Sequence, residues 1–281
     1  MSPVLRLAAA AALAVALPAW SAAQEPQYVS AGKSYFARRD EKGVVAEAQM
    51  KLDADPKNVE LMIALGDAHA GVWDHKAAIA VYDRAFALAP AKPLLHQQRG
   101  HRYLSIREFA KARRDLEKAV ELDAKLAGAW YYLGLLRYLD GDFKGAADAY
   151  ARNVALAERF EAAVGGVDWQ YMSLKRAKQD EQAAALLLRV TPDLKIEGNA
   201  RIYFGRLLLY KGLRTEAELL AGTLDDIQLT TLSYGIGNWH LWEGRAAEAR
   251  SHFEKAASTS AWPALAFIAA EVELRRAPAA R

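Results

Sequence analysis

Apolar and small residues recur along this chain at the spacing of helix faces. In the stretch 129–150, large residues from Trp130 onward follow an i, i+3, i+4, i+7 spacing that stops at 140–142 and resumes toward Tyr150. This pattern predicts two helices joined by a tight turn. Gly134 lies in the middle of the first helix face, where glycine costs about 1 kcal/mol relative to alanine. We therefore expect a close packing contact that needs the missing side chain.

The same small residue returns at a fixed interval. Gly32, Gly66, Gly100 and Gly134 follow one another every 34 residues, with no insertion between them. When each glycine is numbered position 8 of a repeat, position 20 is again small and position 24 is mostly large. A fixed period with two small positions is the signature of repeated helix pairs. The regular repeats are 25–58, 59–92, 93–126 and 127–160.

The pattern weakens but continues after the fourth repeat. Asp168 and Asp180 replace the small residues at positions 8 and 20 of the fifth segment, and glycine and alanine return there afterwards. Thr215 and Glu218 have the spacing of a capping box that begins a helix. A last amphipathic helix is predicted over 262–276, where it covers the end of the stack. The later segments are 161–194, 198–229 and 230–263, followed by a tail at 277–281.

This arrangement resembles the tetratricopeptide repeat (TPR) family. The second repeat carries most of the residues that mark the family, namely Met62, Leu65, Gly66, His69, Ala78, Tyr82 and Pro90. The resemblance implies that each repeat is a pair of antiparallel helices, A and B, in which large residues fill the seam and small ones let the helices approach. It further implies an all-α, right-handed superhelical solenoid of about seven helix pairs over residues 24–276, with a C-terminal capping helix.

Composition narrows the functional classes. The 281 residues are 53% hydrophobic and 25% charged, so the chain can bury a sizeable core. The net charge of +3 comes from 37 basic and 34 acidic residues without blocks of one sign, which gives no basis for nucleic-acid binding. Val, Ile and Thr rarely alternate with polar residues, so strands are not expected. The absence of cysteine excludes disulfides, metal–thiolate sites and a lipidated cysteine.

The N-terminus has the three-part form of a secretory signal. Arg6 precedes an unbroken apolar run from Leu7 to Leu17, and small residues up to Ala23 offer a cleavage site. The run is shorter than the roughly 20 residues that span a bilayer. A buried N-terminal helix is the alternative. We therefore expect cleavage of residues 1–23 near Ala23, and a mature chain that is a soluble periplasmic or secreted bacterial protein without stable membrane insertion.

Motifs of known catalytic sites are missing. The sequence contains no G-x-x-x-x-G-K-[ST] phosphate loop, no H-E-x-x-H zinc motif and no G-x-S-x-G nucleophile elbow. Its six histidines show no spacing typical of metal ligands. We therefore predict a protein that is not an enzyme, with no catalytic residues, no metal site and no cofactor.

Aromatic residues gather where the TPR resemblance places the inner groove. In that family, side chains at positions 2, 5, 9 and 12 of the A helices commonly line a concave surface that binds peptides or partner proteins. Here these positions and their neighbours form an aromatic stripe, although some of them also suit packing between repeats. Tyrosine and tryptophan dominate protein-binding hot spots. The predicted groove residues are Tyr131, Tyr132, Leu135, Tyr138, Trp169, Met172, Tyr203, Arg206, Tyr210, Tyr234 and Trp242.

The resemblance also limits which TPR subclass the chain fits. TPR grooves that clamp a C-terminal carboxylate use Lys and Asn at positions 5 and 9, whereas the second repeat has Ile63 and Asp67 there. A fainter likeness, carried by 168–187 and 234–274, is to bacterial cell-envelope TPR lipoproteins of the NlpI type, without their lipidated cysteine.

These observations predict an exported adaptor that binds a protein or peptide partner of the cell envelope in its aromatic groove. The alternative is a structural component of an envelope complex that self-associates through its solenoid surface. The sequence leaves open the identity of the partner, the oligomeric state and whether a bound peptide is extended or helical.

Overall fold

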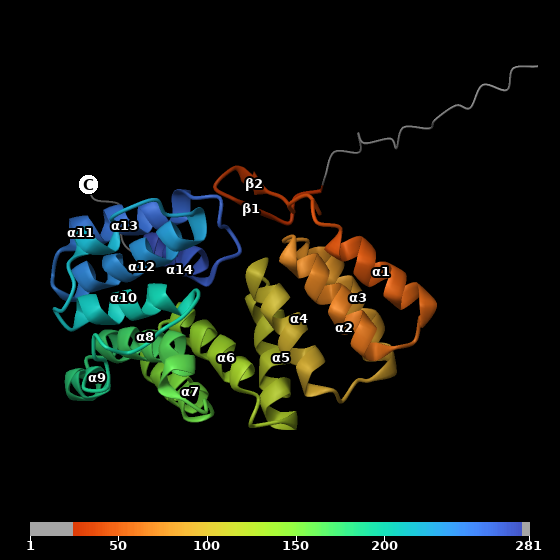
Figure 1. Cartoon of the computed structure of the whole chain (residues 1–281), viewed down its shortest axis with the longest axis horizontal. Coiled ribbons are helices and arrows are strands. Elements are labelled where there is room, and N and C mark those ends of the chain that lie inside the picture. The colour runs from red at the N-terminus through yellow and green to blue at the C-terminus, as the bar shows by residue number, and fades with distance from the viewer. Residues whose placement is uncertain (1–24, 277–281) are drawn as a thin grey trace, which may run out of the picture.

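Helices form nearly all of the regular structure of this chain. The computed structural model describes residues 25–276, and the predicted signal (1–23) and tail (277–281) lie outside the described residues. Among the residues described, no helix is long and apolar enough to cross a membrane. The elements labelled in Figure 1 are β1 (Tyr28–Ser30), β2 (Lys33–Tyr35), α1 (Val44–Ala54), α2 (Val59–Gly71), α3 (His75–Leu88), α4 (Pro93–Ser105), α5 (Phe109–Leu122), α6 (Ala127–Asp140), α7 (Phe143–Ala155), α8 (Phe160–Arg176), α9 (Asp180–Leu187), α10 (Ala200–Tyr210), α11 (Glu216–Leu219), α12 (Asp226–Trp242), α13 (Ala246–Ser258) and α14 (Leu265–Arg276).

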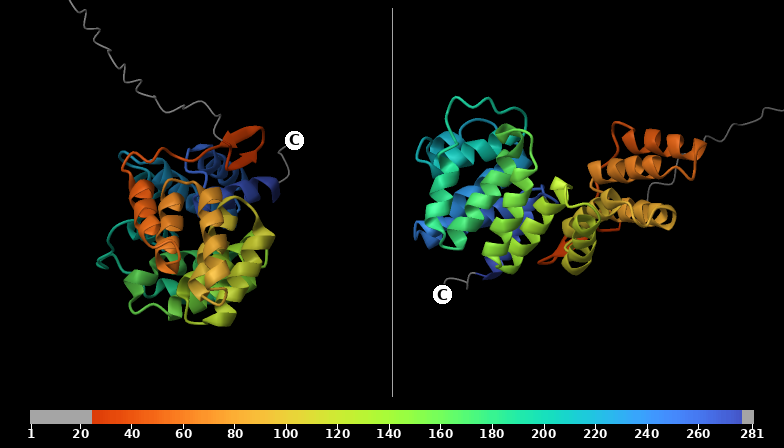
Figure 2. Two further views of the ribbon diagram at one scale, coloured as in Figure 1. Left: turned by 90° about the vertical axis from the view of Figure 1, so that its right-hand side faces the viewer. Right: turned by 90° about the horizontal axis from the view of Figure 1, so that it is seen from below.

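Successive helices form antiparallel pairs that stack along the chain. The pairs are α2 with α3, α4 with α5, α6 with α7, α8 with α9, α10 with α11 and α12 with α13. At one end α1 stands without a preceding helix, and at the other end α14 packs against α12 and α13. Figures 1 and 2 show that the stack curves, so that the C-terminal helices return toward the N-terminal ones. The predicted all-α solenoid of helix pairs is confirmed.

Glycine at position 8 makes room for the large residue at position 24. A Cβ atom built on Gly134 would lie 2.9 Å from the ring of Tyr150, and one built on Gly66 would lie 2.3 Å from the ring of Tyr82. Both tyrosine side chains are fully buried. The close contact expected at Gly134 is therefore confirmed, and the group that fills the space is a side chain of the B helix.

The prediction for the first repeat is wrong in its first helix. Residues 28–35 form an antiparallel hairpin in which Tyr28 pairs with Tyr35, although no strands were expected from the composition. Ala31 and Gly32 have positive φ angles of 48° and 77°, which suits a two-residue hairpin turn. Nothing lies within 4 Å of a Cβ built on Gly32, so this glycine serves the turn and no helix contact. Only the B helix of this repeat, α1, is present.

Local signals end and begin several helices. Gly141, Gly212 and Gly244 lie at or just after the ends of A helices and have left-handed φ angles between 75° and 87°. The Thr215 hydroxyl accepts a bond from the Glu218 amide at 3.2 Å, and the Glu218 carboxylate accepts one from the Thr215 amide at 2.7 Å. The predicted capping box at the start of α11 is therefore confirmed.

Two consecutive B helices, α9 and α11, are short, whereas the B helix α13 of the last pair has 13 residues. Helix α9 has 8 residues and α11 has 4, whereas α3 and α5 have 14 each. The inner faces of α6, α8 and α12 meet in this part of the molecule. The ring of Trp169 lies 5.5 Å from that of Tyr138 and 5.5 Å from that of Tyr234.

Candidate partner-binding groove

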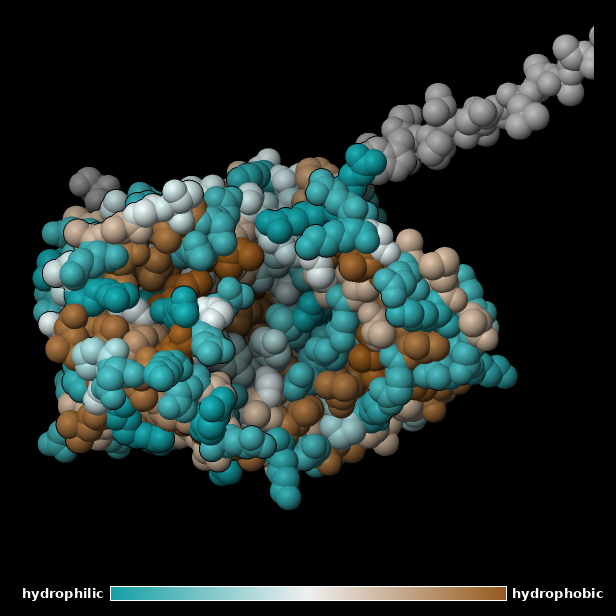
Figure 3. Space-filling view, in the orientation of Figure 1, coloured by the Kyte–Doolittle hydropathy of each residue, from teal (hydrophilic) through white to brown (hydrophobic). Residues whose placement is uncertain are grey.

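A cavity remains where the two arms of the arc face each other. Figure 3 shows the surface hollowed between the N-terminal and the C-terminal helices. The cavity has a volume of about 360 Å³. It is bordered by helices α2, α4, α6, α10 and α12, by the starts of α3 and α14, and by the loop before α14. Its aromatic and polar lining residues are Trp73, His75, His101, Arg102, Tyr131, Tyr132 and Tyr203.

Tyrosine side chains form one wall of this cavity. Tyr131 and Tyr132 on α6 and Tyr203 on α10 are half-buried, and the first two rings meet edge to face at 5.7 Å. Burial raises the pKa of the Tyr131 and Tyr203 hydroxyls, so both stay protonated at neutral pH. The wall therefore offers apolar ring surface together with neutral hydroxyl groups.

His75 is a buried polar side chain without a partner. It begins α3, is 3% exposed, and neither ring nitrogen has a hydrogen-bond partner. Its ring lies edge to face on Trp262 at 5.3 Å. Burial, assisted by the charges of Arg102 and Arg107, lowers the pKa of His75 to about 3. The imidazole is therefore neutral at physiological pH, with one nitrogen that donates and one that accepts.

Arg102 contributes a positive charge to the same cavity. Its guanidinium donates to His101 Nδ1, and its Nε is buried without a partner. The His101 ring in turn stacks on Tyr132 with centroids 4.0 Å apart. Other arginines nearby are paired, since Arg99 lies 2.7 Å from Asp115. Arg102 has no such carboxylate within ion-pair distance among the described residues.

A group that we call the clasp joins the two ends of the arc. It consists of Tyr28, Arg107, Trp262 and Glu271. Arg107 Nη2 lies 2.8 Å from Glu271 Oε2 and donates to the Trp262 carbonyl at 2.9 Å. The Tyr28 hydroxyl donates to Glu271 at 3.3 Å, and its ring stacks on Trp262. The clasp holds the hairpin and the α4–α5 turn against α14 and the loop before it. Figure 1 shows the hairpin at the top of the view, between the N-terminal and the C-terminal helices.

Comparison with known proteins gives short matches to curated relatives. No family profile matches the chain. A stretch of 106 residues is 32% identical to the heat-shock protein cognate (HSC) co-chaperone sgt12 of Aspergillus fumigatus, which covers 38% of this chain and 31% of the relative. A stretch of 70 residues is 39% identical to Hsc70-interacting protein 1 of Drosophila melanogaster, over 25% and 19%. The chain therefore spans less than a third of the length of these relatives.

A solved structure matches the fold over most of its length. A tetratricopeptide repeat protein from Parabacteroides merdae aligns with a TM-score of 0.51 and 17% identity, covering 80% of this chain and 89% of that one. This likeness concerns the fold, and it agrees with the 34-residue helix pairs and their position-8 glycines. The chain has the fold of a tetratricopeptide-repeat protein. The cavity lies between helices of this fold.

The comparisons correct the predicted location. The curated relatives come from a fungus and a fly, and both are named for heat-shock cognate proteins. They point away from a periplasmic or secreted bacterial TPR protein, so that prediction is wrong.

Six predicted groove residues of this TPR chain are core residues instead. Each is at most 1% exposed. The six residues are Leu135, Tyr138, Trp169, Met172, Arg206 and Tyr234. Four of them lie on the inner faces of α6 and α8, which α12 and α14 cover, and the other two lie on α10 and α12. Tyr210 and Trp242 are partly buried around Tyr171, with ring distances of 5.0 and 5.7 Å, and do not line the cavity. Of the predicted set, Tyr131, Tyr132 and Tyr203 do line it.

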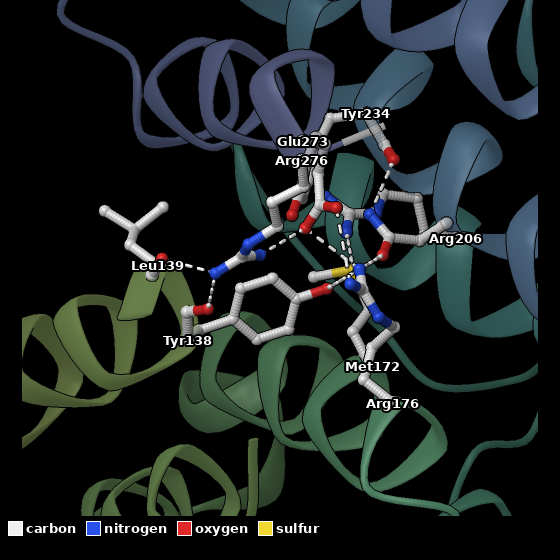
Figure 4. Close-up of polar contacts among 9 residues, drawn as sticks. Tyr138, Leu139, Met172, Arg176, Arg206, Tyr234, Glu273 and Arg276 are labelled. Atoms are coloured by element: carbon white, nitrogen blue, oxygen red, sulfur yellow. Dashed lines mark hydrogen bonds and ion pairs between the residues drawn. The ribbon is translucent and has the colours of Figure 1, made fainter. Parts of the chain in front are cut away.

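Polar contacts fix the C-terminal helices on the inner TPR faces (Figure 4). Arg276 of α14 donates to the Tyr138 carbonyl near the end of α6 at 3.0 Å. Glu273 accepts from Arg276 at 2.8 Å and from Arg176 of α8 at 2.9 Å. The Tyr138 hydroxyl donates to Asn238 of α12 at 2.8 Å. These bonds occupy the polar atoms that an open groove would present to a partner.

The acidic residue at position 8 of the fifth segment has a buried partner. Asp168 Oδ2 lies 3.0 Å from Arg206 Nη2, and both side chains are fully buried. Burial raises the pKa of Asp168 to about 7, against the opposing effect of Arg206. Arg206 also donates to the Tyr210 hydroxyl and the Thr231 carbonyl. Because buried ion pairs gain little net energy, we assign this one to positioning α8, α10 and α12.

Two histidines and a glutamate meet outside the groove. Glu216 lies 2.9 Å from His240 Nε2 and 3.0 Å from His252 Nε2, which are ligand types that zinc accepts. Sequence spacing did not show this trio, because its members lie on three helices. Arg245 Nε donates to His240 Nδ1 at 2.7 Å, so His240 carries its proton on Nε2 and donates it to Glu216. Both ring nitrogens of His240 are thereby hydrogen-bonded, whereas His252 Nδ1 is buried without a partner.

Sequence reasoning missed the residues that make the cavity polar. Trp73 and His75 lie at the turn between α2 and α3, and Trp262 lies in the loop before α14. Repeat positions of the TPR pattern describe helix faces and say little about turns. Arg102 falls at position 10 of the third repeat, directly after His101. The sequence does not reveal that Arg102 lacks an acidic partner, because that depends on which side chains the fold brings near it.

Proposed function

We propose that this chain is a non-enzymatic TPR adaptor that binds a protein or peptide partner in the cavity between its N-terminal A helices and the loop before α14. The observation that carries the proposal is the cavity itself. In a molecule whose inner faces are otherwise covered, it keeps half-buried aromatic rings, an unpartnered His75 and an unpaired Arg102 facing one space.

Buried polar groups normally have hydrogen-bond partners, and aromatic rings with polar tips are typical anchors of protein interfaces. Both features suit a surface that a partner completes. The two curated relatives are named a heat-shock cognate co-chaperone and an Hsc70-interacting protein, which supports a protein as the class of partner. A space of about 360 Å³ fits one or two large side chains, so we propose that an extended segment inserts an anchor residue.

Peptide phage display on the full chain tests the proposal. Peptides that bind are measured by calorimetry against Trp73→Ala and Tyr132→Ala, which remove cavity walls. We expect each change to weaken binding by about tenfold or more, as for interface anchors. The matched control is Leu188→Ala, because Leu188 is 77% exposed and lies outside the cavity. Selected peptides that keep full affinity for both cavity variants would place the binding surface elsewhere and overturn the proposal.

A further inference from the structure

We propose that the cavity is a subsite for a carboxylate that lies next to an aromatic group of the ligand, and that Arg102 binds the carboxylate. This inference rests on the proposed binding function and names the chemistry of the group that enters. It differs from the C-terminal carboxylate clamp of other TPR grooves, because that clamp uses positions 5 and 9, whereas Arg102 is at position 10 and His75 lies at a turn.

The charge of the cavity is positive and uncompensated. Arg102 is the charged residue among its lining residues, and none of these is acidic. The nearest paired arginines show what is missing, since Arg99 is held by Asp115 and Arg107 by Glu271. A half-buried guanidinium without a carboxylate is costly, and planar carboxylates match its fork of N–H groups. The ligand group that best completes this site is therefore an anion.

His75 supplies a second polar contact without a second charge. Its ring is 3% exposed and both nitrogens lack partners, so a hydrogen bond to a ligand would satisfy a group that the fold leaves open. Its lowered pKa keeps the ring neutral. A neutral imidazole can donate one N–H to a carboxylate oxygen, while Arg102 provides the positive charge.

The side chains that form the walls of the cavity favour an aromatic group in the ligand, next to its carboxylate. Trp73, Tyr131, Tyr132 and Tyr203 present ring surface, which favours an aromatic group over a short acid. Tyrosine faces also attract cations, but Arg102 repels a cation from this space. A phosphate monoester carries about −1.5 to −2 charges at neutral pH, more than one guanidinium compensates. A singly charged carboxylate fits the site better.

Calorimetry with three small probes on the full chain tests this chemistry. The probes are 3-phenylpropionate, its amide and 2-phenylethylamine, which share a ring and differ in charge. We expect the acid to bind at least about tenfold more tightly than the amide, and the amine to bind no better than the amide. Equal affinity for acid and amide would overturn the inference, and so would a lack of acid binding at millimolar concentration.

Variants assign the carboxylate to Arg102. Arg102→Gln should abolish the preference for the acid over the amide, while Arg113→Gln should leave it unchanged. Arg113 is a suitable control because it lies on the neighbouring helix α5 and pairs with Asp140 outside the cavity. Circular dichroism checks that each variant folds. A preference that survives Arg102→Gln in a folded protein would overturn the assignment, and the wild-type comparison of acid with amide stands whatever the variant does.

Peptide variants show whether the carboxylate that binds belongs to an acidic side chain or to the C-terminus of the partner. A peptide selected by phage display is compared with versions in which Asp and Glu become Asn and Gln, or in which the C-terminus is amidated. Loss of at least about tenfold in affinity with either version identifies a carboxylate of the partner as the occupant. If peptides bind through Trp73 and Tyr132 without any acidic preference, the proposed adaptor function stands and the carboxylate subsite fails. If 3-phenylpropionate binds and no peptide does, the carboxylate subsite stands and the proposed binding of a protein or peptide partner fails.

Discussion

Both arms of this molecule are built from the same kind of helix pair. The inner face of the pairs borders a cavity in one arm and is covered by other helices in the other arm. In the N-terminal arm, α2 to α5, the B helices α3 and α5 are 14 residues long and the inner face borders the cavity. In the C-terminal arm, α8 to α14, the B helices α9 and α11 are short, α13 has 13 residues, and the inner face is covered by α12 and α14.

The two arms differ at position 8 of one segment. Position 8 is glycine in Gly66 and Gly100, and each leaves room for the large position-24 side chain of its own helix pair. In the fifth segment the same position is Asp168, whose buried partner Arg206 holds α10 close to α8. Because Gly205 and Gly237 keep position 8 in the covered arm, the feature that distinguishes this arm is the buried pair of Asp168 and Arg206.

The largest expected loss of stability comes from a substitution in the core of the C-terminal arm. Trp169 is 1% exposed and contacts the rings of Tyr138, Tyr150 and Tyr234. Trp169→Ala should therefore lower the free energy of unfolding by about 3–5 kcal/mol, because the cavity it leaves cannot close. The measurement is urea unfolding followed by circular dichroism. The matched variant Tyr132→Ala, on the open face, should cost clearly less, and equal losses would mean that the two arms do not differ.

The next largest effect is a loss of stability at low pH, which we expect from His75 in the N-terminal arm. The unfolded pKa of histidine is about 6.5, and that of His75 in the folded chain is about 3. The folded state binds a proton at His75 more weakly than the unfolded state does. The contribution of His75 to stability is therefore complete above pH 6.5 and falls as the pH is lowered toward 3. The loss should reach about 3 kcal/mol by pH 4.

Comparison with His75→Phe isolates this histidine from the carboxylates that titrate in the same range. We expect the variant to lose less stability than the wild type between pH 7 and pH 4 in urea unfolding. Identical pH profiles for the two proteins would show that His75 is not buried in a neutral form.

The sequence alone was sufficient for the parts of the fold that repeat. Gly134 and Tyr150 lie 16 residues apart at fixed positions, so their contact follows from the period. The hairpin at Tyr28 to Tyr35 was missed because Gly32 happens to fall in the 34-residue series, and a turn glycine and a packing glycine look the same in one sequence.

The candidate site was predictable only in part, for a related physical reason. Tyr131 and Trp169 occupy the inner-face positions 5 and 9 of their A helices, yet Tyr131 lines the cavity and Trp169 is in the core. What separates them is the curvature of the stack, which depends on contacts between segments far apart in sequence, such as Arg276 with Tyr138. A repeat pattern describes each pair and its neighbours and does not report how far the stack bends.

The smallest expected effect sharpens the comparison at the junction of the arms. Gly134 lies on α6, and a Cβ there would come within 2.9 Å of the buried Tyr150 ring, whereas nothing lies within 4 Å of a Cβ on Gly71, the last residue of α2. Gly134→Leu should therefore overpack the helix pair and cost about 1–3 kcal/mol, and Gly71→Leu should cost little, since both changes remove a helical glycine. Thermal unfolding by circular dichroism measures both. Because helix pairs couple mainly to their neighbours, hydrogen exchange in Gly134→Leu should speed up first in α4 to α8. Unchanged stability in Gly134→Leu, or equal losses in the two variants, would show that the glycine at position 8 is not needed for the packing of α6 against α7.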